Sequence, residues 1–113
     1  MPSEERRDLF PGALEMMVLQ ILRRGPLHGY AIAQHIRQTS GELLAVEEGS
    51  LYPALQRLLR DDWVRAEWGI SAKNRRVRIY RITPAGKKQL EREVMSFEQM
   101  LEGIARVMRP AES

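Results

Sequence analysis

The side chains in this sequence that are best suited to bind a ligand are hydrogen-bonding and cationic ones, and they lie in two segments. In SLYPALQRLLRDD, residues 50–62, a helical period turns Gln56 and Arg57 away from the apolar positions. Glutamine pairs with adenine, and arginine with guanine, through two hydrogen bonds each, so this pattern favours contact with base edges. The second segment, residues 73–78, is rich in cations that can bind phosphates. The candidates are Ser50, Tyr52, Pro53, Gln56, Arg57 and Arg60, followed by Lys73, Asn74, Arg75, Arg76 and Arg78.

Several of these side chains also have simpler interpretations. Tyr52 could donate its hydroxyl to a phosphate or cap the second segment, but half-buried packing explains it equally well. Gln56 and Arg57 could simply be solvated. Arg60 is better placed to meet a phosphate or the adjacent Asp61 than a base.

The backbone before the first segment offers two further candidates, His28 and Tyr30. They stand where a helix is expected to begin, and free backbone N–H groups at a helix start can bind a phosphate. Packing of the Tyr30 ring against its own domain is the alternative.

The charge distribution supports an anionic partner. The chain has 113 residues and a formal net charge of +3. Residues 50–82 carry eight basic against three acidic side chains, whereas residues 1–49 carry five basic against seven acidic ones. A positive field confined to one segment is expected where one face meets a polyanion, although a plain basic surface would look the same.

Catalysis and metal binding have little support. The sequence has no cysteine and none of the motifs GxSxG, GxxxxGK[ST] or HExxH. His28 and His35 are seven residues apart, but no carboxylate or cysteine completes a chelating set at the usual spacing. We therefore expect no enzyme activity, no cofactor and no metal.

The same sequence predicts a cytoplasmic protein. The N-terminus MPSEERRDLF places acids and proline before any apolar run, and no stretch reaches the roughly 18 apolar residues that a membrane span needs. Absence of cysteine is compatible with a reducing compartment. We expect neither a secretion signal nor contact with a membrane.

Five elements must position the candidate residues. Apolar periodicity predicts helices over residues 12–24, from 28 or 29 to 39, and over 50–62. Pro53 lacks an N–H and suits only a first turn, so the third helix should begin no earlier than Gly49 or Ser50, with Ser50 as its N-cap. WVRAEW and RVRIYRI, residues 63–68 and 76–82, predict a hairpin with a loose tip. Thr83 is an expected N-cap, and Pro84 opens a long last helix over residues 84–108.

The last helix carries apolar residues with spacings of 4, 3, 4, 3 and 4, the alternation of a heptad seam. The first helix is apolar over a wide face, which suggests cover from a second subunit. The seam could instead pack on its own domain. The expected dimer contacts are Leu14, Met17, Val18 and Ile21, with Leu90, Val94, Phe97, Leu101, Ile104 and Met108.

This order of elements is that of a winged helix-turn-helix, a mainly α fold with a small β-hairpin (α+β) and a long C-terminal dimerisation helix. The third helix would lie in a major groove, and the hairpin would form a wing along phosphates. Strand alternation puts Arg76 and Arg78 on one face and Arg75 and Arg81 on the other, so we expect Arg81 to be structural. Trp63 and Trp68 are interpreted as anchors of the core and wing. The expected boundaries are a tail over 1–9, the winged-helix domain over 10–83 and the dimerisation helix over 84–109.

Three local motifs sharpen this interpretation. GPLHGYAIAQHI (25–36), EEGSLYPALQRL (47–58) and NRRVRIYRITPAGKKQL (74–90) resemble the PadR family of transcriptional regulators, and the resemblance runs from Phe10 to about Leu101. The short last helix is similar to the smaller branch of that family. The resemblance implies a homodimer that binds double-stranded DNA, usually as a repressor, and that can be released by a small-molecule effector.

We therefore expect two recognition helices to enter successive major grooves of a near-palindromic operator. The alternative is a winged-helix dimer that serves as a protein-interaction or sensor module without specific DNA binding.

Overall fold

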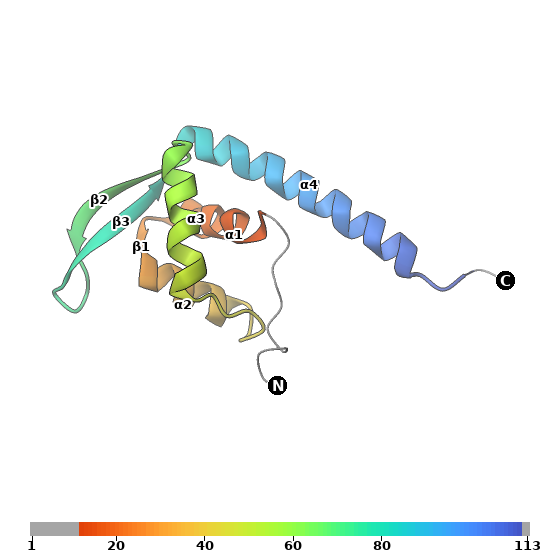
Figure 1. Cartoon of the computed structure of the whole chain (residues 1–113), viewed down its shortest axis with the longest axis horizontal. Helices are drawn as coiled ribbons and strands as arrows, with labels where there is room; N and C mark the ends of the chain where they lie inside the picture. The colour runs from red at the N-terminus through yellow and green to blue at the C-terminus, as the bar shows by residue number, and fades with distance from the viewer. Residues whose placement is uncertain (1–11, 112–113) are drawn as a thin grey trace.

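In the computed structural model, residues 12–111 are described, and they form four helices and three strands (Figure 1). The expected tail over 1–9, and the start of the domain at residue 10, lie outside the described residues. The helices are α1 (Ala13–Arg24), α2 (Gly29–Thr39), α3 (Glu48–Arg60) and α4 (Pro84–Met108), and the strands are β1 (Leu27–His28), β2 (Val64–Ile70) and β3 (Arg76–Ile82).

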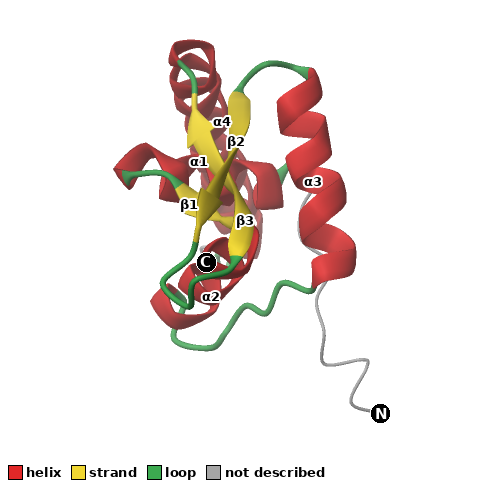
Figure 2. Ribbon diagram, turned by 90° about the vertical axis from the view of Figure 1, so that its left-hand side faces the viewer, coloured by secondary structure: helices red, strands yellow, loops and turns green. Residues whose placement is uncertain are grey.

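The strands form an antiparallel sheet in the order β1-β3-β2. The hairpin of β2 and β3 was predicted, although β2 runs two residues further than expected, through Gly69 and Ile70. Strand β1 was not predicted, because two residues are too short to show an alternating pattern. It pairs Leu27 with Tyr80 and joins the segment before α2 to the base of the hairpin. Figure 2 shows α3 running along one side of the strands.

Helix α1 is the centre of the core and contacts α2, α3, α4 and β3. These four elements cover its broad apolar face, and Val18 and Leu19 are completely buried within the single chain. These positions are therefore already covered without a second subunit, and a dimer contact through α1 stays a prediction. Leu14, Val18 and Ile21, expected at a dimer interface, lie in the chain's own core, and Met17 is half-buried against it.

The start of α3 also differs from the expectation. The helix begins at Glu48, with Glu47 as an extended N-cap residue, so Ser50 lies inside the first turn and caps nothing. Pro53 then stands within the helix, where its missing N–H leaves the carbonyl of Gly49 without a helical donor. Both residues are exposed, so solvent can satisfy that carbonyl.

Thr83 caps α4 as predicted and also ties the helix to the end of α3. Its hydroxyl oxygen accepts a hydrogen bond from the Gly86 N–H at 2.9 Å and donates one to the carbonyl of Asp62 at 2.7 Å. Its own N–H donates to the carbonyl of Trp63 at 3.0 Å. One buried side chain therefore sets the direction in which α4 leaves the sheet.

Replacing Thr83 with valine should lower the free energy of unfolding by about 1 to 2 kcal/mol, because the shape is kept while the cap is lost. Urea denaturation measures this. Thr83→Ser retains the hydroxyl and should stay close to the wild type. Equal stability of the valine and serine variants would contradict a structural role for the hydroxyl.

The apolar seam of α4 divides into two parts. Leu90 is 1% exposed and belongs to the core, and Val94 packs against that core, so the first part follows the alternative of packing on its own domain. Leu90 is therefore not available to a partner surface. Residues 101–111 are all exposed, and Figure 1 shows this end of α4 projecting away from the other elements.

Candidate nucleic-acid interface

Helix α3 presents the predicted outward face. Leu51, Leu55 and Leu58 are buried on the core side, a spacing that leaves the opposite side to solvent. The exposed side chains are Ser50, Tyr52, Pro53, Gln56, Arg57 and Arg60.

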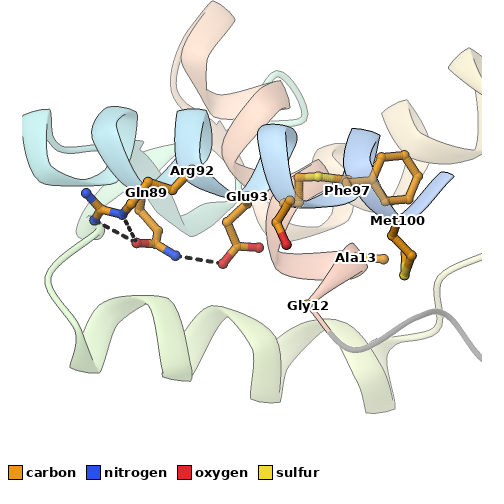
Figure 3. A pocket seen from close by; sticks show the side chains of 9 residues that line it. Gly12, Ala13, Gln89, Arg92, Glu93, Phe97 and Met100 are labelled. Carbon is orange, nitrogen blue, oxygen red and sulfur yellow. Dashed lines mark hydrogen bonds between the residues drawn. The ribbon is translucent and has the colours of Figure 1, made fainter. Parts of the chain in front are cut away.

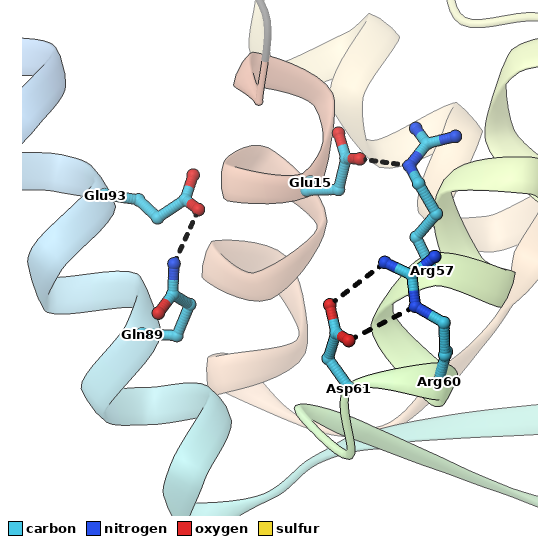
Figure 4. Close-up of polar contacts among 6 residues, drawn as sticks. All are labelled: Glu15, Arg57, Arg60, Asp61, Gln89 and Glu93. Atoms are coloured by element: carbon cyan, nitrogen blue, oxygen red, sulfur yellow. Dashed lines mark hydrogen bonds and ion pairs between the residues drawn. The ribbon is translucent and has the colours of Figure 1, made fainter.

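The two edges of this face have different neighbours. Tyr52 lies against Gly29, where a Cβ added to the glycine would come within 3.0 Å of the phenol oxygen. Arg57, five residues later, is turned by about 140° around the helix axis. Its Nε donates to a carboxylate oxygen of Glu15 at 2.6 Å, so this edge faces α1 (Figure 4).

The Glu15–Arg57 pair spans two helices and was not predicted. Glu15 is only 18% exposed, against 47% for Arg57, so the carboxylate is the more fixed partner. The contact uses the Nε edge of the guanidinium and leaves both terminal nitrogens for a ligand. Glu15 thus orients Arg57 and leaves hydrogen-bond donors of the guanidinium available.

Arg60 behaves as its position suggested. It donates to both carboxylate oxygens of Asp61, at 3.2 and 3.3 Å (Figure 4). Donating to the Asp61 carboxylate raises the pKa of Arg60 above its usual value. The pair uses Nε and one terminal nitrogen of Arg60, so the other terminal nitrogen can still donate to a ligand.

The start of α2 lies beside the edge of α3 that carries Tyr52. His28 is half-buried, pairs in register with Ile79 and forms the extended N-cap residue of α2. Tyr30 is exposed, and Gln34 donates to its hydroxyl at 3.3 Å. The contact between Gly29 and Tyr52 brings this region next to α3. Packing does not account for the exposed Tyr30 ring.

The wing tip is a tight turn between β2 and β3. The Ser71 N–H donates to the carbonyl of Arg75 at 2.8 Å, and Asn74 has a φ of 62°. Asparagine tolerates this left-handed conformation better than most residues. The turn leaves a row of exposed polar side chains: Lys73, Asn74, Arg75, Arg76 and Arg78.

Strand alternation separates the wing arginines as expected. Arg81 forms a cross-strand ion pair with Glu67 at 3.3 Å on one face of the hairpin. Arg76 and Arg78 lie on the other face, where both guanidinium groups lie over the Trp68 ring. Trp63 is half-buried against the core, whereas Trp68 is exposed and anchors no core.

A cavity of about 480 Å³ opens between α1 and α4 (Figure 3). Polar and apolar side chains both face it. Its lining residues are Gly12, Ala13 and Met16, with Gln89, Arg92, Glu93, Ser96, Phe97 and Met100. Gln89 donates to Glu93 at 2.8 Å and accepts from Arg92 at the same distance.

Residues 12–111 contain neither a candidate metal cluster nor a candidate membrane-spanning helix. No cluster of three or more His, Asp or Glu side chains in that range could hold a metal ion. None of the helices there combines the length and apolar character needed to cross a bilayer.

Comparison with known proteins connects this geometry to a family. Residues 18–92 match the model of the transcriptional regulator PadR-like family. A solved transcriptional regulator from Clostridium thermocellum, Cth-833, has a TM-score of 0.80 at 29% identity, covering 88% of this chain and 96% of that one.

Two longer relatives match in part. An uncharacterized 37.1 kDa protein in transposon TN4556 of Streptomyces fradiae is 45% identical over 76% of this chain, which spans 23% of that protein. The negative transcriptional regulator PadR of Bacillus subtilis is 26% identical over 68% of this chain, which spans 42% of it.

A structure of Bacillus subtilis PadR in complex with operator DNA shares the fold, with a TM-score of 0.62 at 21% identity, covering 89% of this chain and 50% of that one. The family match includes α2, α3, the whole hairpin and the start of α4, which are the elements that build the candidate interface. This chain belongs to the PadR-like family of transcriptional regulators, which are not enzymes.

Proposed function

We propose that this protein is a homodimeric, sequence-specific DNA-binding repressor that recognises a near-palindromic operator. The observation that carries the proposal is an exposed polar face on α3 beside a cationic wing. Helix α3 would read bases in a major groove, and the start of α2 and the wing would bind phosphates. The proposed contacts are His28, Tyr30, Ser50, Tyr52, Pro53, Gln56, Arg57, Arg60, Lys73, Asn74, Arg75, Arg76 and Arg78.

The comparisons support this choice. Bacillus subtilis PadR is named a negative regulator and has been crystallised with operator DNA, so repression is the natural proposal for a chain with the same fold. The proposed DNA ligand also leads us to place the protein in the cytoplasm.

A second copy of the chain would cover the projecting end of α4. Leu101, Ile104 and Met108 are exposed although they continue an apolar heptad seam. Met17 and Phe97 are half-buried and could extend the contact, whereas Val94 is already packed on the core. A twofold dimer would then set the recognition helices about 34 to 36 Å apart, one turn of DNA.

The cavity between α1 and α4 supports an effector proposal. Its lining includes Phe97, a residue of the proposed seam, so a small molecule bound there could alter how the subunits are arranged. Release from DNA would require the molecule to bind the DNA-free arrangement more tightly than the bound one.

The test is fluorescence anisotropy on DNA from the protein's own upstream region and on a shuffled duplex, at low and near-physiological salt. We expect a preference for the native sequence that survives the higher salt, because phosphate contacts alone weaken steeply and do not discriminate. Gln56→Ala and Arg57→Ala should each reduce that preference by about 5- to 150-fold, the range for one bidentate base contact. Arg106→Ala, which removes the same charge far along α4, is the matched control for Arg57.

A second candidate function is a protein-interaction module of the same fold. Equal, salt-sensitive binding to both duplexes would mean that this upstream region holds no operator or that the wing grips DNA without reading it; selection from random duplexes separates the two. No binding to any duplex at low salt would favour the interaction module.

A further inference from the structure

The wing carries an exposed indole stacked with two guanidinium groups. The Cζ atom of Arg76 lies 4.3 Å from the centroid of the Trp68 ring, and that of Arg78 lies 5.6 Å from it. Trp68 is 57% exposed. Trp68 therefore does not serve to fill the core, and its exposed position next to two arginines needs another explanation.

The register of the hairpin fixes this arrangement. Trp68 pairs directly with Arg78, and Ile70 pairs with Arg76, so the indole and both arginines share one face of the sheet. A guanidinium that lies flat on an aromatic ring keeps its N–H groups around the rim, where they can still donate. Stacking therefore removes rotamer freedom from the two arginines without using their donors.

The same face continues toward α3. Arg78 also lies 6.0 Å above the ring of Tyr80, which pairs with Ala66 at the base of the hairpin. Burial raises the pKa of Tyr80, while the nearby Arg78 lowers it and Tyr52 of α3 raises it. Trp68, Arg78 and Tyr80 thus follow one another along this face, with Tyr52 of α3 near its Tyr80 end.

We propose that Trp68 is a positioning residue that holds Arg76 and Arg78 ready to bind the phosphates of one DNA strand beside the groove entered by α3. This inference rests on the proposed DNA-binding function and assigns part of it to a residue that was interpreted only as an anchor. Two long side chains that are already ordered in the free protein raise the affinity for DNA, because less conformational entropy is lost on binding.

The hairpin supplies its own control. Arg81 has the same charge but lies on the opposite face, paired with Glu67 at 3.3 Å. Removing it changes the net charge as removing Arg76 does, without touching the Trp68 stack. If Trp68 acted only by stabilising the wing as a whole, its effect on DNA binding would not depend on the arginines that share its face.

The experiment is a mutant cycle in anisotropy on the operator, at low salt and as a function of salt. Trp68→Leu should weaken binding about two- to fivefold, the fold-change expected for an exposed cation–π contact, and Trp68→Phe should lie between leucine and wild type. In the Arg76→Ala/Arg78→Ala background, Trp68→Leu should change nothing further. Arg76→Ala should reduce the salt slope by about 0.9, and Arg81→Ala should leave the operator preference and the Trp68 effect intact.

The free protein gives a second readout. In a Trp63→Phe background Trp68 is the one remaining indole in the sequence, and Arg76→Ala should increase its quenching by acrylamide. Thermal melting establishes that each variant is folded. The inference is overturned if Trp68→Leu weakens binding equally with and without the two arginines. It is also overturned if the wild type binds and Trp68→Leu binds equally well. A wild type that binds no duplex overturns the proposed function as well.

Discussion

Replacing Leu101 and Ile104 with aspartate should convert the protein to folded monomers and weaken operator binding by about 100- to 10,000-fold. Both side chains are exposed on the part of α4 that projects beyond the core, so the change removes little intramolecular packing. Two carboxylates facing their symmetry mates would instead be repelled and desolvated at the seam. Affinity is lost because a dimer that binds two half-sites at once binds about 100- to 10,000-fold more tightly than a monomer that binds one.

Light scattering after gel filtration measures the mass, and anisotropy measures the affinity of the same samples. Gln99→Asp with Gly103→Asp is the matched control, because it adds two negative charges on the outward side of the same helix. Val94 is a poor choice for this test, since it packs on the core and its loss would weaken the fold. A Leu101/Ile104 variant that remains dimeric would place the interface elsewhere.

Replacing Gly86 with alanine should destabilise the whole domain by about 3 kcal/mol or more, the upper range for overpacking. A Cβ at this position would lie 2.1 Å from the carbonyl oxygen of Trp63 and 2.8 Å from Cγ1 of Ile82. The Trp63 carbonyl already accepts the Thr83 N–H, so it cannot move without loosening the start of α4. For a domain of this size the melting temperature should fall by about 12 to 24 °C.

Thermal unfolding followed by circular dichroism checks this result. Gly103→Ala is the control, since the same change in the same helix meets no atom within 4 Å. That variant should gain about 0.5 to 1 kcal/mol from the better helix propensity of alanine. Similar melting temperatures for the two variants would mean that α4 does not pass so close to the start of β2.

Much of the fold was predictable because it depends on local spacing. The apolar period identified all four helices, the β-branched and aromatic runs identified the hairpin, and Thr83-Pro84 identified the start of α4. The outward face of α3 followed from the same period, since residues opposite Leu51, Leu55 and Leu58 had to face solvent. Each of these patterns depends only on residues that are close together in the sequence.

Other features were missed because their cause lies elsewhere in the chain. Strand β1 exists because β3 offers it a free edge at Tyr80 and Ile79. The start of α3 at Glu48 depends on a proline tolerated within the helix beside an exposed glycine. The ion pair between Arg57 and Glu15 joins residues 42 positions apart, and no local pattern announces it.

The sequence by itself determined which residues are apolar, which are cationic and how each is spaced along its element. Tertiary structure alone decided that α1 is covered by its own chain, that the α4 seam is buried at Leu90 and open at Leu101, and that Trp68 stacks on arginines. The physical reason is that periodicity reports the direction of a side chain relative to its own helix or strand axis. Whether that direction ends in a core, in solvent or against a charge depends on the elements packed around it.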